Sequence, residues 1–184
     1  DCPWDDPENG QFGAAQRIAE RRGITREQLD ALGAASQQKA AVAWAEGRFD
    51  REIVTVEGAP LTDGDGQATG ETMTVDRDQG LRDTTVESLA NLKPVIPGTL
   101  HTAGTSSQIS DGSAAVLWMD EEAANQRGIT PRARIAYHTM VGSDPYYLLD
   151  GPVDATQKML DQTNYTIDDF DLFECNEAFA AVLL

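Results

Sequence analysis

The sequence predicts an α/β protein with a mostly parallel sheet. In its last third, apolar segments of strand length alternate with segments that carry helix caps, and Gly, Pro and Asp residues separate the two kinds. Apolar residues make up 40% and charged residues 24% of the 184 residues. This composition is globular, and the length suits one domain or parts of two.

The chain up to about residue 49 is expected to be helical. Thr25 and Gln28 have the spacing of a capping box, which predicts that a helix begins at Thr25. Small and apolar side chains then recur on one face at helical spacing, namely Leu29, Leu32, Ser36, Ala40 and Ala43. Because many of them are small, this helix is expected to pack closely on a neighbour and to end at Gly47.

Residues 51–100 are expected to be irregular because of their Gly and Pro content. A short strand is predicted at 52–56, and a turn at 63–66. A helical turn is predicted from Ser88 to Leu92, ended by the Lys-Pro pair that follows.

From Thr102 onward, strands and helices are expected to alternate. Residues 114–119 are apolar throughout, as in a strand covered on both faces. Asp120 is predicted to cap a helix that runs to Arg127 and is closed by Gly128. The remaining predictions are strands beginning at 134–137 and covering 170–175, a helix from Pro152 through Leu160, and a helix from Asn176 onward.

Charge and composition exclude several functions. The formal net charge of −17 would repel nucleic acid and anionic membranes, and its even spread indicates a well-solvated surface. No apolar run approaches the roughly 20 residues that cross a bilayer. The first residues resemble no signal peptide, so a cytoplasmic protein is expected. Two cysteines without paired spacing and two isolated histidines predict neither a disulfide framework nor a metal site.

Several short motifs resemble one enzyme family. Residues 176–179, Asn-Glu-Ala-Phe, follow an apolar strand and resemble a signature of the thiolases. Further segments resemble that family in the same order along nearly the whole chain: 23–27, 47–53, 92–94, 102–112 and 151–153. The residues around Arg48, at 80–82 and at Ser106-Ser107 are most similar to those of bacterial thiolases of steroid side-chain β-oxidation.

This resemblance implies a fold and an activity. The fold would be the layered αβαβα thiolase fold with an inserted loop domain, here covered only in part. Residues 1–99 would form the loop domain, 100–127 the last strand and helix of the N-terminal half, and 128–184 the start of the C-terminal half. The implied enzyme is an acetyl-CoA C-acyltransferase that cleaves 3-ketoacyl-CoA with CoA, or runs the reverse Claisen condensation, in lipid or steroid side-chain β-oxidation.

The resemblance also implies partners. These are CoA and acyl-CoA, with CoA as a substrate and no permanently bound cofactor or metal. The protein would be a homodimer or homotetramer that binds neither nucleic acid nor membrane.

Asn176 is the implied catalytic residue. Its side-chain amide would hold a water in an oxyanion hole, a role that suits a neutral group able to donate and accept. The alternative is that Asn176 only caps the helix that follows. Glu177 has two interpretations of equal weight: it hydrogen-bonds neighbouring catalytic loops, or it sits in the first helical turn, where an acid suits the dipole.

Other residues match positions that handle CoA. Ser88, Ala103 and Ser107 would contact CoA, and Ala178 and Phe179 would line the pantetheine tunnel. The alternatives are ordinary loop positions for Ser106 and Ser107 and core packing for Phe179. Arg48 and Arg82 are candidates for binding the CoA phosphates, and the alternative is that they lie on the solvated surface. Leu81 stands where the family has an adenine-pocket arginine, and the nearby Arg82 is the candidate substitute.

The family's nucleophile and acid–base groups have no match. Its Cys-x-Ser-Gly segment would lie upstream, and its Gly-His-Pro and Cys-x-Gly-Gly segments downstream. Cys2, Cys175, His101 and His138 stand in the wrong settings to replace them, and Cys175 is interpreted as a small buried core residue. The chain is therefore expected to be a fragment that aggregates or is partly disordered alone and does not cleave acetoacetyl-CoA. The alternative is a non-catalytic CoA-binding or scaffold subunit of the same fold.

Overall fold

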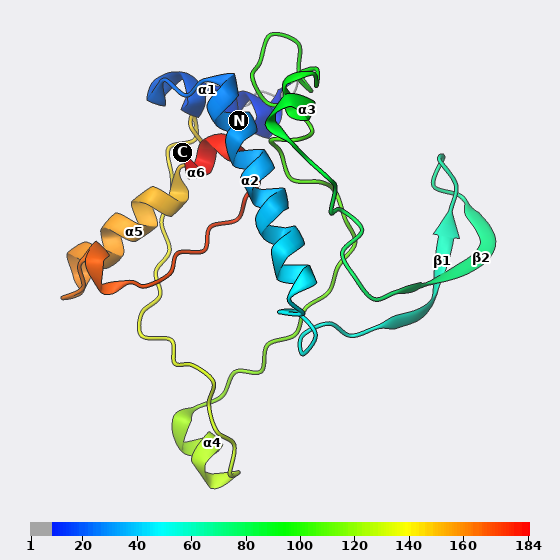
Figure 1. Cartoon of the computed structure of the whole chain (residues 1–184). Helices are drawn as coiled ribbons and strands as arrows, with labels where there is room; N and C mark the ends of the chain where they lie inside the picture. Colours follow the sequence, from blue (N-terminus) through cyan, green and yellow to red (C-terminus); the bar gives the residue numbers. More distant parts are fainter. Residues whose placement is uncertain (1–8) are drawn as a thin grey trace.

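The computed structural model describes residues 9–184, so Cys2 lies outside the described residues. Figure 1 shows a small helical core from which an extended hairpin and two long irregular excursions project. The elements in chain order are α1 (Gly10–Arg22), α2 (Arg26–Ala45), β1 (Val56–Thr62), β2 (Ala68–Val75), α3 (Val86–Ala90), α4 (Glu121–Gln126), α5 (Gly151–Gln162), the 3-10 turn η1 (Ile167–Asp169) and α6 (Ala180–Leu183).

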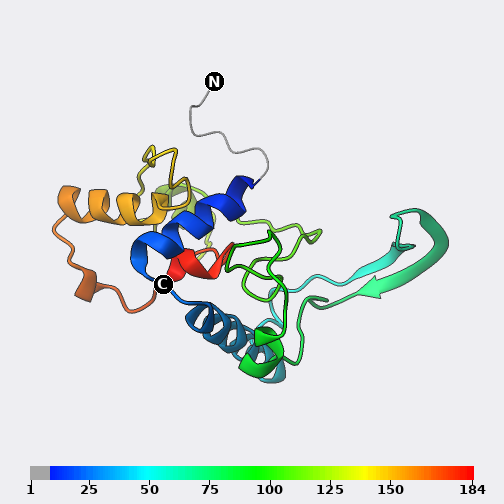
Figure 2. The same ribbon diagram turned by 90° about the horizontal axis from the view of Figure 1, so that it is seen from above.

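The core forms where α6 packs against α1 and α2 (Figure 2). Its buried side chains are apolar and come from both ends of the chain: Ile18, Ala19, Ile24, Leu29, Ala180 and Ala181. Leu100, Tyr147 and Leu149 pack against this cluster from connecting segments. Residues distant in sequence therefore meet around α6, where most of the apolar surface is removed from water.

Local signals placed the start and the packing of α2 correctly. Thr25 Oγ1 accepts from the Gln28 amide at 3.3 Å, and Gln28 Oε1 accepts from the Thr25 amide at 2.8 Å, which confirms the predicted capping box. Gly47 takes the left-handed conformation just after the helix, with φ +65°. The predicted close packing is confirmed at Gly33, where an added Cβ would lie 2.4 Å from the Gly104 carbonyl oxygen.

Strands β1 and β2 form an antiparallel hairpin that projects away from the helices (Figure 1). The turn predicted at 63–66 is confirmed, because the Asp63 amide donates to the Gln67 carbonyl and the Gly66 amide to the Asp63 carbonyl. The strand predicted at 52–56 begins only at Val56. The prediction of an irregular stretch missed β2, whose residues are mostly exposed and half of which are Thr or Glu.

The strands predicted at 114–119, 134–137 and 170–175 are not formed, and these predictions are wrong for this structure. A strand exists only when its backbone groups pair with a neighbour. The hairpin is the only sheet within residues 9–184, and the three segments run singly through solvent. Val116, Leu117 and Trp118 are 68%, 79% and 65% exposed. Cys175, predicted to be buried, is only half-buried because its segment packs on no sheet.

The helices predicted beside those segments do form. Asp120 caps α4, accepting from the Glu122 amide at 2.8 Å. Pro152 stands in the first turn of α5, as predicted. The last helix begins at Ala180 rather than at Asn176. Within residues 9–184, no helix combines the length and the apolar character that a bilayer crossing requires.

Candidate functional site

A hollow of about 680 Å³ opens between α2, the 103–110 segment and the chain before α6. Four residues singled out by the sequence line it together, namely Ala103, Ser107, Asn176 and Glu177. The α2 side is formed by Leu32, Gly33, Ser36 and Gln37. The side chains at its wall are mostly small, so the backbone of several segments is accessible from within.

A tight turn at Thr102–Thr105 builds one wall of the hollow. The Thr102 amide donates to Thr105 Oγ1 at 2.9 Å, and the Thr105 amide donates back to the Thr102 carbonyl at 3.1 Å. Both threonines are buried. Gly104 lies so close to α3 that a Cβ there would stand 2.3 Å from Leu89 Cδ2. Only glycine fits, so this position fixes how closely the turn approaches α2 and α3.

Backbone hydrogen bonds join this wall to the segment before α6. The Ser107 amide donates to the Ala178 carbonyl at 2.9 Å, and the Ala180 amide donates to the Thr105 carbonyl at 3.0 Å. The result is one antiparallel bridge between Ser106 and Phe179. This short ladder holds the 176–179 segment beside Ser107 at the hollow.

Asn176 is exposed at the rim of the hollow and does not cap a helix. The N-cap position of α6 is occupied by Phe179, and Asn176 precedes it in non-helical chain. The capping interpretation of Asn176 is therefore wrong. An amide that is not committed to a helix end remains available to donate and accept within the hollow.

Glu177 reaches across the hollow to α2. Its Oε2 accepts from Ser36 Oγ at 2.5 Å. Glu177 also precedes α6, so the interpretation that places it in a first helical turn is wrong. Its hydrogen-bond partner Ser36 lies in α2. The sequence signal for Ser36 was its place on the small face of α2.

Three predicted site residues, Ser88, Ala178 and Phe179, lie around the hollow without lining it. Ser88 lies inside α3 and completes the capping box of its N-cap residue Thr85. The Ser88 Oγ accepts from the Thr85 amide at 3.0 Å and donates to the Thr85 carbonyl at 2.8 Å. Ala178 is half-buried and contributes its carbonyl to Ser107. Phe179 is 5% exposed and packs edge-on against Phe12 and His101.

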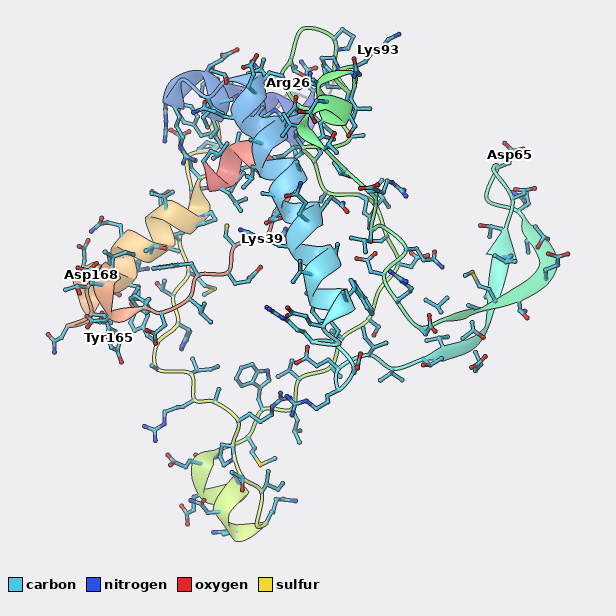
Figure 3. All side chains as sticks on the ribbon, in the orientation of Figure 1. Arg26, Lys39, Asp65, Lys93, Tyr165 and Asp168 are labelled. Atoms are coloured by element: carbon cyan, nitrogen blue, oxygen red, sulfur yellow. The ribbon has the colours of Figure 1, made fainter. Side chains whose placement is uncertain are left out.

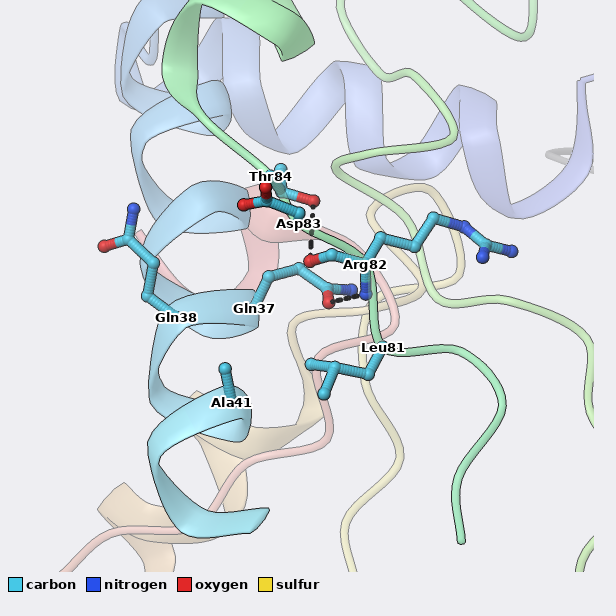
Figure 4. Close-up of a pocket in the computed structure, with 7 residues that line it drawn as sticks. All are labelled: Gln37, Gln38, Ala41, Leu81, Arg82, Asp83 and Thr84. Carbon is cyan, nitrogen blue, oxygen red and sulfur yellow. Dashed lines mark hydrogen bonds between the residues drawn. The ribbon is translucent and has the colours of Figure 1, made fainter. Parts of the chain in front are cut away.

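A second, open hollow of about 330 Å³ adjoins the first (Figure 4). It lies between α2 and residues 81–84, and both Leu81 and Arg82 line it. Gln37 Oε1 accepts from the Arg82 amide at 2.9 Å, which fixes the Arg82 backbone against α2. The Arg82 side chain extends away from α2 (Figure 4), and Arg82 is also among the residues that line the larger hollow. Arg48 lies in neither hollow and pairs with Glu46 instead.

Two buried polar groups near the site were missed by sequence analysis. His101 is fully buried behind Phe179, and neither ring nitrogen has a hydrogen-bond partner among residues 9–184. Burial lowers the pKa of His101 from 6.5 to about 4, so it is neutral near pH 7. Ser106 Oγ is likewise buried without a partner in that range. No pattern around either residue signals its burial.

Figure 3 shows that the charged side chains spread over all the elements rather than gathering at one point. Within the described part of the chain, no three His, Cys, Asp or Glu residues are grouped so that they could hold a metal ion. The two adjoining hollows are lined by small side chains, leucines, amide groups, one arginine and the two acidic residues Asp83 and Glu177. This mixture suits an elongated organic ligand with apolar and polar parts.

Two family models match the chain. The model described as thiolase, N-terminal domain, matches residues 6–122, and the one described as thiolase, C-terminal domain, matches residues 129–184. A 3-ketoacyl-CoA thiolase of Vibrio vulnificus is 46% identical over 177 residues, which are 94% of this chain and 44% of the relative. The steroid 3-ketoacyl-CoA thiolase FadA6 of Mycobacterium tuberculosis is 38% identical over 181 residues, 98% of this chain and 42% of the relative.

Solved structures are similar as well. The acetyl-CoA acetyltransferase of Bacillus anthracis superposes with a TM-score of 0.85 at 34% identity, covering 98% of this chain and 45% of that chain. The acetyl-CoA acetyltransferase of Syntrophomonas wolfei gives a TM-score of 0.77 at 32% identity, covering 94% and 42%. The chain thus spans less than half the length of these relatives.

Proposed function

This chain belongs to the thiolase family, and from that premise we propose that the protein containing it is an acyltransferase acting on 3-ketoacyl-CoA. In thiolysis, a cysteine thiolate adds to the 3-keto carbon, the bond between carbons 2 and 3 breaks, and carbon 2 takes up a proton as acetyl-CoA leaves. The CoA thiol then displaces the cysteine from the acyl group, which gives a shortened acyl-CoA and the free cysteine. Condensation is the reverse.

The observation that carries the proposal is the backbone bridge that sets Asn176 beside Ser107 at one hollow. Attack on a thioester or ketone drives negative charge onto the carbonyl oxygen, which needs a donor already in place. Asn176 is neutral at every working pH, and its amide can orient a water toward that oxygen without changing charge. We assign it this role.

The hollow also suits the arm of CoA. Its volume lies within the range of small-molecule sites, and the small side chains of Ser36, Ala103 and Ser107 leave room for a narrow pantetheine chain. Ser107 is exposed and lines the hollow, so its hydroxyl can bind an amide of that chain. We place the CoA phosphates toward Arg82, which lines both hollows. Ser88, Ala178 and Phe179 then support the walls through the contacts described above.

The nucleophile is assigned to sequence outside the 184 residues. Cys175 is half-buried and does not line the hollow, so it stands in no position to attack a bound thioester. In this proposal the present chain binds CoA and stabilises charge, and a cysteine from elsewhere in the protein becomes acylated.

The pathway, the localisation, the oligomeric state and the domain boundaries are proposed from similarity to the family. Similarity to the enzyme named FadA6 supports a role in steroid side-chain or lipid β-oxidation. We further infer a cytoplasmic homodimer or homotetramer, with residues 1–99 in the loop domain, 100–127 closing the first half and 128–184 opening the second. Comparing kcat/KM for acetoacetyl-CoA and for a steroid-derived 3-ketoacyl-CoA separates these substrate classes.

The test of the catalytic assignment is thiolysis by the full-length gene product. Asn176→Ala is expected to lower kcat by about 10²–10³-fold with little change in KM for CoA, as for loss of one oxyanion donor. The matched control is Asn125→Ala, which removes an exposed amide in α4. Turnover of Asn176→Ala within twofold of the unaltered protein would refute the role of Asn176.

A non-catalytic CoA-binding or scaffold subunit of the same fold is the second candidate. It is favoured by one observation, the absence of any cysteine lining either hollow among residues 9–184. The same assay decides, because a scaffold subunit would bind CoA in calorimetry and yet show no thiolysis as the full-length gene product.

A further inference from the structure

Three arginines of α1 point toward one loop, residues 144–150, which precedes α5. Arg21 Nη2 lies 2.5 Å from Asp150 Oδ2, and Arg22 Nη2 lies 2.8 Å from Asp150 Oδ1. Arg17 Nε donates to the Tyr146 carbonyl at 2.8 Å. The guanidinium groups of Arg17 and Arg21 also lie over the rings of Tyr146 and Tyr147, at 4.6 and 4.1 Å. We call the Arg21–Arg22–Asp150 group the arginine clasp.

Asp150 is diverted from the role that its position predicts. It is the N-cap residue of α5, where an Asp side chain normally accepts from the first amides of the helix. Here it makes no such bond, and each carboxylate oxygen is taken by one arginine. Asp150 is only 7% exposed. A buried carboxylate is costly unless it is paired, so this pairing outcompetes the helix cap.

The loop that the clasp holds has an uncommon backbone. Leu148 has φ +55°, and it is the only non-glycine residue in 9–184 with a positive φ. Its amide donates to the Asp144 carbonyl at 2.7 Å, and its carbonyl accepts from Ser143 Oγ at 3.0 Å. Such a conformation persists only where the surroundings over-determine it. Bonds within the loop hold Leu148 itself, and α1 holds Tyr146, Tyr147 and Asp150 on either side of it.

The clasp is linked to the candidate site through α6. Arg22 Nη1 donates to the carbonyls of Ala181 and Val182 at 3.1 and 3.4 Å, so one guanidinium binds both α6 and Asp150. Tyr147 and Leu149, on either side of Leu148, pack against the core that contains Ala180 and Ala181. Since α6 follows directly on 176–179, a displacement of α6 would move Asn176 relative to Ser107.

We propose that the arginine clasp is a positioning device that fixes α6 on α1 and thereby holds Asn176 at the hollow. This inference rests on the proposed function, because it assigns the clasp to the site of that reaction. Arg21, Arg22 and Asp150 touch no substrate in this account. They act through the placement of Asn176, so their loss should affect turnover more than CoA binding.

The first arm of the test is hydrogen exchange in the full-length gene product. Asp150→Asn keeps the shape of the side chain and removes its charge. We expect the amides of Ala180–Leu183 and of Ser107 to exchange at least tenfold faster. The exchange rates of amides in β1 and β2 should not change. Arg134→Gln breaks an exposed pair with Glu121 and serves as the matched control, with no change in either region. Faster exchange confined to residues 144–151 would overturn the proposal.

The second arm is kinetic. Per acylatable active site, Asp150→Asn is expected to lower kcat at least tenfold and to leave KM for CoA within twofold. Arg22→Lys keeps the positive charge at residue 22, so it should lower kcat less than Asp150→Asn does. This milder variant also guards against the case in which Asp150→Asn fails to fold. Faster α6 exchange with unchanged kcat would overturn the positioning role. No turnover in the unaltered protein would instead refute the proposed function, and the exchange arm would still decide whether the clasp holds α6.

Discussion

The buried His101 makes the free energy of unfolding depend on pH in the acidic range, because burial lowers the pKa of its ring to about 4. His101 has no exposed surface and no hydrogen-bond partner within residues 9–184, and its pKa falls from 6.5 to about 4. Above pH 6.5 the ring is neutral in both folded and unfolded chains and adds nothing to the pH dependence. Between pH 6.5 and 4 the unfolded chain binds a proton that the folded chain excludes, so stability falls as the pH falls.

The size of the effect follows from the same values. At about 1.4 kcal/mol per pKa unit, the full loss is about 3 kcal/mol, and about 2 kcal/mol of it occurs between pH 8 and pH 5. Glu27, Glu87 and Asp169 also have lowered pKa values, each first because of backbone hydrogen bonds. Their stabilising contribution is lost only at more acidic pH, so the window from pH 8 to 5 isolates the histidine.

The assay combines NMR with urea unfolding. The chain has two histidines, so the ring signal that disappears in His101→Leu identifies His101. We expect that signal to stay at its neutral position from pH 8 to 5. We also expect His101→Leu to lose about 2 kcal/mol less than the unaltered chain over that range. A titration midpoint near 6.5 for His101 would refute the reasoning, since it would show that the ring is solvated.

Two further predictions concern packing around α2. Gly33→Ala is expected to destabilise the chain by about 1–3 kcal/mol in urea unfolding, because the new Cβ would lie 2.4 Å from the Gly104 carbonyl oxygen. Gly64→Ala, where nothing lies within 4 Å, is its control, and equal effects of the two would contradict the close approach. Asp30→Ala is expected to cost about 3–5 kcal/mol, because it leaves Arg26 half-buried without its carboxylate. Arg134→Ala, in an exposed pair, should cost less than about 1 kcal/mol, and a cost for Asp30→Ala no larger than that would show that the buried pair is not needed.

Helix boundaries were predictable because their signals are local. The capping box at Thr25, the Asp120 cap and the Pro152 start each depend on residues within one turn. The start of α6 was misplaced because Asn176 is a good cap residue, yet the bridge between Ser106 and Phe179 keeps the chain extended to that point.

Strands were less predictable because pairing depends on distant chain. Residues 114–119 have the apolar composition of a buried strand, but a strand forms only against a partner, and residues 9–184 supply none there. Strand β2 was missed for the opposite reason. Its residues are mostly exposed, and it is held by the hairpin turn and by pairing with β1 rather than by apolar burial.

The candidate site was predictable as a set of segments and not as a geometry. Resemblance singled out Ala103, Ser107 and Asn176, but nothing in their spacing shows that the Ser107 amide binds the Ala178 carbonyl. The Ser36–Glu177 hydrogen bond and the arginine clasp also join residues far apart in sequence. Long-range contacts of this kind come from the packing of α1, α2 and α6.

The most direct test is a crystal structure of the full-length gene product with CoA bound. We predict that the pantetheine arm passes between Ala103 and Ser107 in the larger hollow, with the CoA sulfur directed toward Asn176 and the phosphates toward Arg82. Density for CoA elsewhere on the protein, with this hollow empty, would contradict the account.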